Sequence, residues 1–106
     1  MVMLEKTLEA YFVHRVEGAG GIAEKTVSPG GRGYFDRVCV FPGGRVVFVE
    51  LKRPKRSTTS AHQRTRHERY ISLGAEVAVV RSLADVDRLL EKGVDQMPQR
   101  HPNRFL

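Results

Sequence analysis

The sequence predicts a single domain of the mixed α/β class, with a central sheet covered by helices. Helix-like and strand-like segments alternate along a chain of 106 residues, and two neighbouring strand-like segments are nearly continuous in apolar residues. Strands that are apolar on both faces must be covered on both faces, which helices do. The expected order is α-β-β-β-α-β-α, a mixed sheet flanked by helices rather than a doubly wound one.

The first half of the chain supplies one helix and three strands. Apolar residues at three- and four-residue spacing predict a helix over residues 4–16, which the glycines of residues 18–21 end. A short edge strand is expected over 22–27, followed by a glycine-rich loop over 28–33. Residues 34–41 then predict the second strand.

The second half begins with a turn and the most apolar strand. Pro42-Gly43-Gly44-Arg45 predicts a hairpin turn, and residues 46–52 predict the third strand. Further along we expect a helix over 60–73, a strand over 76–80 and a helix over 83–90 that Gly93 ends. We place the domain at residues 1–93. Residues 94–106 form a tail, either flexible or an arm that packs on a partner protomer.

Composition and charge narrow the class of function. Hydrophobic residues make up 41% of the chain and charged residues 28%, as in ordinary soluble domains. The apolar runs are far shorter than the ~20 residues of a membrane-spanning helix, so no membrane partner is expected. A single cysteine, Cys39, fits the reducing cytoplasm. The net charge of +6 favours an anionic partner, most often nucleic acid.

Three charged residues form a candidate catalytic group. Glu50 and Lys52 end the most apolar strand and leave it on the same face, and Asp36 lies on the preceding strand. Two converging carboxylates can hold a hard divalent cation such as Mg²⁺. A lysine beside them can orient an attacking water or neutralise charge that builds on a phosphate.

The turn decides whether these three residues can meet. With a two-residue Gly43-Gly44 loop, Asp36 would lie opposite Leu51 and point away from Glu50. An odd loop, such as Pro42-Gly43-Gly44 with a glycine bulge, brings Asp36 opposite Glu50. For an isolated Asp and Glu-x-Lys, surface ion pairs are the commoner explanation. The apolar strand, the glycine loop and the basic segment after Lys52 favour a site.

The same residues carry a resemblance to a known family. Lys25, Ser28-Pro29-Gly30, Gly33–Arg37, Pro42–Lys52 and Gln63 resemble the virus-type replication-repair nuclease (VRR-NUC) domain of the PD-(D/E)XK nuclease superfamily. The likeness extends from about Leu4 to Leu90 and is strongest to small stand-alone members from phages and prophages. If a phage encodes the protein, the expected cytoplasm is that of a bacterial host. One departure is Phe35, which stands where the family usually has a proline before the aspartate.

The resemblance implies a PD-(D/E)XK fold and a phosphodiesterase that acts on DNA with Mg²⁺ or Mn²⁺. It assigns the metal to Asp36, Glu50 and the backbone carbonyl of Leu51. A glutamate of the first helix commonly completes the acidic cluster, and Glu5 fits this pattern best, with Glu9 next.

It also assigns catalytic roles to Lys52, the motif lysine, and to Gln63, which the family places beside the active site. Small members of the family are associated with homodimers that cut branched DNA such as four-way junctions. The expectation is therefore a structure-selective endonuclease that works as a homodimer. Two alternatives stay open: a nuclease for flaps or ends, and a non-catalytic DNA-binding subunit on the same fold.

Basic residues around the proposed site are the expected DNA contacts, although a solvated helix face is the common alternative for such charge runs. His62 and His67 are five positions apart, which is wrong for one helical face, so neither is expected to bind metal, although His67 could touch a phosphate. The expected contacts are Lys25, Arg32, Arg37, Arg53, Lys55, Arg56, Arg64 and Arg66.

Overall fold

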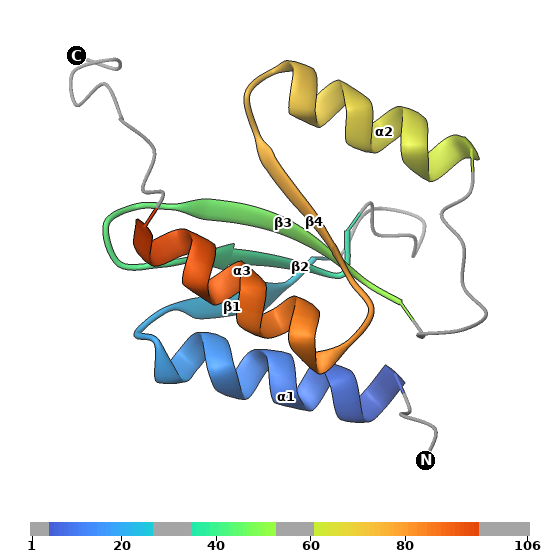
Figure 1. Ribbon diagram of the computed structural model, residues 1–106. Helices are drawn as coiled ribbons and strands as arrows, with labels where there is room; N and C mark the ends of the chain where they lie inside the picture. Colours follow the sequence, from blue (N-terminus) through green and yellow to red (C-terminus); the bar gives the residue numbers. More distant parts are fainter. Residues whose placement is uncertain (1–4, 27–34, 53–60, 96–106) are drawn as a thin grey trace.

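The computed structural model describes residues 5–26, 35–52 and 61–95, and these have the predicted order of elements (Figure 1). The predicted mixed α/β fold is confirmed. The elements are α1 (Glu5–Gly18), β1 (Ile22–Lys25), β2 (Arg37–Val40), β3 (Val46–Leu51), α2 (Ala61–Ser72), β4 (Glu76–Val80) and α3 (Leu83–Asp95).

The four strands form one mixed sheet in the order β1-β2-β3-β4. The pairs β1–β2 and β2–β3 are antiparallel, while β3 and β4 are parallel. The parallel pair requires a crossover connection, and the segment that carries α2 provides it.

Helices α1 and α3 cover one face of the sheet and build the main core (Figure 1). Alternate residues of β3 point into this core, so Val47, Val49 and Leu51 are at most 3% exposed. The two helices are also joined to each other, because Tyr11 and Arg15 of α1 both bond Asp87 of α3. The other core members from the helices are Leu8, Phe12, Val16, Val86 and Leu89.

Helix α2 packs on the opposite face through aromatic rings. Phe48, which alternates with the core residues of β3, contacts the rings of Phe35 and Tyr70. Phe35 also contacts His67 of α2. Strand β3 is therefore covered on both faces, as its continuous apolar sequence predicts.

The β2–β3 hairpin has the odd loop that the candidate site requires. The N–H of Phe41 donates to the carbonyl of Arg45 at 2.8 Å, which leaves Pro42, Gly43 and Gly44 as a three-residue loop. Both glycines have a φ near +90°, a conformation that suits glycine far better than other residues. Arg37 consequently pairs with Val49, and one further step along both strands leads to Asp36 and Glu50.

Two element boundaries differ from the prediction by three or more residues. Strand β2 begins at Arg37 rather than at residue 34, because the chain bends at Phe35 and Asp36. Helix α3 was expected to end near Leu90 and Gly93, but it continues to Asp95. A glycine ends a helix when it turns left-handed, as Gly74 does after α2 with a φ of 94°; Gly93 keeps the helical conformation.

Candidate active site

The site lies at the C-terminal end of β3, on the α2 side of the sheet. Because Leu51 points into the α1–α3 core, Glu50 and Lys52 point the other way. Glu50 is only 7% exposed, and Lys52 follows the strand directly and is half-buried. The Lys52 N–H donates to the Val80 carbonyl at 2.9 Å, which holds this end of β3 against β4.

Asp36 reaches the same strand end from the bend before β2. Its backbone N–H donates to the Val49 carbonyl at 2.9 Å. Its carboxylate oxygen Oδ2 accepts the backbone N–H of Leu51 at 2.7 Å. These two bonds fasten Asp36 to the chain on either side of Glu50, so the two carboxylates are neighbours.

Gln63 of α2 bridges the two charges of β3. Its Nε2 donates to Glu50 Oε2 at 3.0 Å, and its Oε1 accepts a hydrogen bond from Lys52 Nζ at 3.1 Å. Lys52 Nζ lies 3.4 Å from the same Glu50 oxygen. The structure thus brings together Asp36, Glu50, Lys52 and Gln63, the four residues to which the sequence assigns catalytic roles.

Burial, and then the charge of Asp36, raise the pKa of the Glu50 carboxyl above its ordinary value. The Lys52 ammonium and the Gln63 amide act in the opposite direction and offset only part of this effect. Ionising Glu50 is therefore unfavourable in the metal-free site, and the positive charge of a bound cation would favour the ionised form.

The donor set fits a hard divalent cation. Asp36 and Glu50 offer carboxylate oxygens, and the carbonyl of Leu51 belongs to the same strand end. In the part of the chain that the structure describes, no third His, Cys, Asp or Glu side chain joins these two carboxylates to form a larger metal-binding group. Glu5 begins α1, but its side chain lies outside the described residues.

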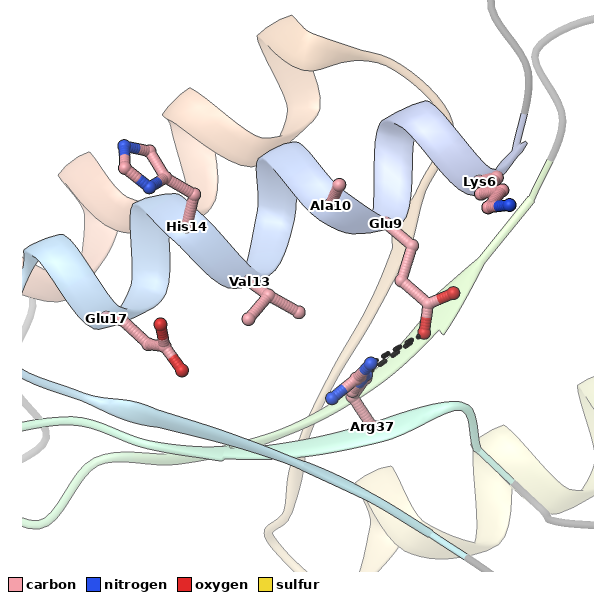
Figure 2. A pocket seen from close by; sticks show the side chains of 7 residues that line it. All are labelled: Lys6, Glu9, Ala10, Val13, His14, Glu17 and Arg37. Carbon is pink, nitrogen blue, oxygen red and sulfur yellow. Dashed lines mark hydrogen bonds and ion pairs between the residues drawn. The ribbon is translucent and has the colours of Figure 1, made fainter.

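Glu9, the other candidate for the acidic cluster, lies on the opposite face of the sheet. Figure 2 shows its carboxylate directed at Arg37. Glu9 Oε2 accepts hydrogen bonds from Nε and Nη2 of Arg37 at 3.1 and 2.9 Å. Arg37 alternates with Asp36 and points toward α1. The pair lines a pocket of about 480 Å³ beneath α1 that is separate from the carboxylates of the site.

The expected DNA contacts divide into three groups. Arg64 is exposed and Arg66 half-buried on α2, the helix that also carries Gln63. Arg37 is engaged by Glu9 and by the Ala23 carbonyl, and Lys25 pairs with it in the β1–β2 register, so both share the α1 face. The others lie outside the described residues: Arg32, Arg53, Lys55 and Arg56.

His67 belongs to the wall of the site, which sequence reasoning missed. Its ring is 7% exposed, so it is enclosed rather than presented to a phosphate. Burial, and then the charge of Lys52, lower the pKa of this imidazole below 6.5. The sequence signal was the spacing of Gln63 and His67, since residues four apart share a helical face.

Cys39 has a structural role in the core. It is fully buried in the core between the sheet and the α1–α3 layer. Burial raises the pKa of the Cys39 thiol to about 12, so a thiolate nucleophile is not available at this position.

The mixed sheet with its flanking helices, and a strand ending in Glu-x-Lys beside an aspartate, define the PD-(D/E)XK class of nuclease folds. A solved structure described as "VRR_NUC domain" superposes with a TM-score of 0.75 and 36% identity, covering 82% of this chain and 94% of that one. The chain is also 42% identical over 78 residues to "Putative nuclease p44" of Acyrthosiphon pisum secondary endosymbiont phage 1. The aligned residues cover 74% of this chain and 83% of that relative. No family model matches the chain.

The chain belongs to the VRR-NUC family and is a nuclease. Within the described ranges, no helix is long and apolar enough to cross a membrane.

Proposed function

We propose that the protein is a divalent-metal-dependent DNA endonuclease whose reaction is carried by Asp36, Glu50, Lys52 and Gln63. The observation that supports this most directly is the bridge from Lys52 through Gln63 to Glu50, with Asp36 bonded beside it. A surface ion pair would not need a buried carboxylate whose pKa is raised by burial and then by the charge of a second carboxylate.

Asp36, Glu50 and the Leu51 carbonyl would hold Mg²⁺ or Mn²⁺. The ion supplies Lewis acidity for the phosphate and lowers the pKa of a bound water. Lys52 is held by Gln63 and Glu50, so its ammonium is positioned before substrate arrives. It either orients the water that attacks phosphorus or neutralises charge on the phosphate as the P–O bond breaks.

Glu5 is the residue that we propose for completing the acidic cluster. Glu9 is engaged by Arg37, whereas Glu5 opens α1 at the end of the helix that lies toward the C-terminal end of β3 (Figures 1 and 2). Glu5→Gln is expected to weaken cleavage more than Glu9→Gln does.

The substrate that we propose is branched DNA, cut by a homodimer. The support is the family resemblance together with geometry, since symmetric cleavage of a two-fold junction needs two sites and this domain has one. Linear, flapped, splayed and four-way substrates, each with and without Mg²⁺ or Mn²⁺, form the test. Preferred cutting of flaps or free ends would replace the junction model, and a monomer in sedimentation on junction DNA would refute the homodimer.

Divalent cations should stabilise the wild-type protein. A cation that binds only the folded state adds about 1.4 kcal/mol to the free energy of unfolding at ten times its Kd. Thermal unfolding with and without Mg²⁺ should therefore differ by several degrees, and EDTA should reverse the difference. An equal shift in Asp36→Asn would mean that the cation binds elsewhere.

DNA affinity should depend strongly on salt, because the net charge is +6 and the basic residues of α2 lie on the helix that carries Gln63. Arg64→Ala should weaken binding to all DNA sequences alike and reduce the salt slope by about 1. Arg88→Ala on α3 is a matched control, and binding titrations at several salt concentrations make the comparison. Equal slopes for Arg64→Ala and wild type would remove Arg64 from the interface.

A further inference from the structure

The active site is assembled from two separate parts of the fold. Asp36, Glu50 and Lys52 come from the sheet, whereas Gln63 comes from α2. The two hydrogen bonds of Gln63 have ordinary lengths of 3.0 and 3.1 Å, and they form only while α2 keeps its position over the sheet. Something must therefore hold the helix at this point.

A cluster of four rings joins α2 to the sheet next to the site. Phe35 lies at its centre, with ring-centroid distances of 5.3 Å to Phe48, 5.2 Å to His67 and 5.0 Å to Tyr70. Phe35 is 4% exposed and His67 is 7% exposed, so water is excluded from their contact. Their planes are 14° apart, which makes this the one stacked pair among the described rings of the cluster.

Each ring of the stack belongs to a residue that lies close in the chain to a residue of the site. Phe35 immediately precedes Asp36 in the bend before β2. His67 lies one helical turn after Gln63 and on the same face of α2. Moving either ring would therefore shift a catalytic side chain.

The stack also explains the residue that departs from the family pattern. A proline before Asp36 would restrict the backbone through its own ring. Phe35 has no such restriction, so the bend depends on how the phenyl ring packs. Packing between Phe48 and α2 supplies this restraint.

We propose that the Phe35–His67 stack positions the active site by locking Asp36 and Gln63 relative to each other. The proposal rests on the nuclease function proposed above for the same site. Neither ring touches reacting atoms, so both are positioning residues. The proposal assigns this role to the packing of the His67 ring, since its Nε2 is buried and has no hydrogen-bond partner among the described residues.

His67→Ala, His67→Phe and Gln63→Ala test the proposal in steady-state cleavage assays. We expect His67→Ala to lower kcat on the order of a hundredfold, because small displacements of catalytic groups are costly. KM for DNA should change little, since the arginines of α2 remain. His67→Phe should restore most of kcat and raise the Tm above wild type, because the unpaired nitrogen is gone.

A double variant separates positioning from general stability. If His67 acts through Gln63, then Gln63→Ala should reduce kcat much less in His67→Ala than in the wild type. Val86→Ala is the matched control: this core residue of α3 lies on the other face of the sheet, so its loss should lower the Tm and leave kcat unchanged below the Tm.

Several outcomes would overturn the proposal: a wild-type kcat in His67→Ala, independent effects of Gln63→Ala and His67→Ala, or a His67→Phe as impaired as His67→Ala. The last would assign the role to the nitrogen. A wild-type protein without metal-dependent cleavage would instead overturn the proposed metal-dependent endonuclease function. That result differs from the outcomes above, because they concern the variants and require an active wild type.

Discussion

Glu50→Gln should abolish metal-dependent DNA cleavage, with a loss in rate on the order of a thousandfold or more. Glutamine keeps the size and one oxygen of the side chain but not the charge that a divalent cation requires. DNA binding should persist, because the basic residues are unchanged. Single-turnover cleavage of a preferred substrate, with binding measured in parallel, gives both quantities.

The same substitution should make the metal-free protein more stable. Burial and the charge of Asp36 raise the pKa of Glu50, so the ionised carboxylate costs folding free energy at neutral pH. This cost is fully present above the raised pKa and disappears below the ordinary value of 4.5, where both folded and unfolded chains are protonated. The stability advantage of Glu50→Gln over wild type should therefore shrink as the pH falls toward 4.5.

Glu24→Gln is a matched control, since it removes the same charge from an exposed position on the edge strand β1. It should leave both cleavage and stability near wild type. Cleavage by Glu50→Gln within about tenfold of the wild-type rate would exclude Glu50 as a metal ligand. An advantage that persists below pH 4.5 would refute the electrostatic origin.

Arg45→Leu should give the largest loss of stability among the charged residues that the structure describes. Arg45 is 2% exposed, pairs with both oxygens of Glu76, and donates to the Leu89 carbonyl at 2.9 Å. Its guanidinium also lies 5.2 Å from the centroid of Phe41. One residue thus ties the hairpin to β4 and α3.

Removing one partner of a buried ion pair costs about 3–5 kcal/mol. Glu76 retains some solvent contact, with 26% of its side chain exposed, so we expect about 3 kcal/mol for Arg45→Leu. For a domain of this size the Tm should fall by ~12 °C or more. Urea unfolding and calorimetry measure the two quantities.

Arg88→Leu is the matched control for Arg45→Leu. Arg88 pairs with Asp85 within α3, but its side chain is 69% exposed, and exposed pairs contribute about 0–1 kcal/mol. The double variant Arg45→Leu/Glu76→Leu should be more stable than Arg45→Leu alone, because it has no unpaired carboxylate at position 76. Equal costs at Arg45 and Arg88 would show that burial of the pair does not matter.

The predicted site agrees with the structure where its logic was local. Alternation along a strand places Glu50 and Lys52 on one face, whatever surrounds them. The position of Asp36 depended on loop length, and two adjacent glycines permitted the odd loop without requiring it. The hydrogen bonds of Phe41 decide the loop, because they close it over three residues.

The residues that sequence reasoning misjudged are those whose roles depend on distant partners. Arg37 was expected to contact DNA, yet its guanidinium is occupied by Glu9, far away in the chain. Arg45 was read only as part of a turn, although Glu76 and Leu89 bury it. His67 gained its place in the site wall from Phe35. No local pattern encodes such pairings.

The sequence by itself determined the element order, the two covered faces of β3, and the common direction of Glu50 and Lys52, because periodicity and side-chain alternation act within a few residues. Only the tertiary structure decided which carboxylate joins them, that Gln63 bridges their charges, and that a stack of Phe35 on His67 lies beside the site. These contacts join residues from different elements, so they exist only once α2 has packed on the sheet.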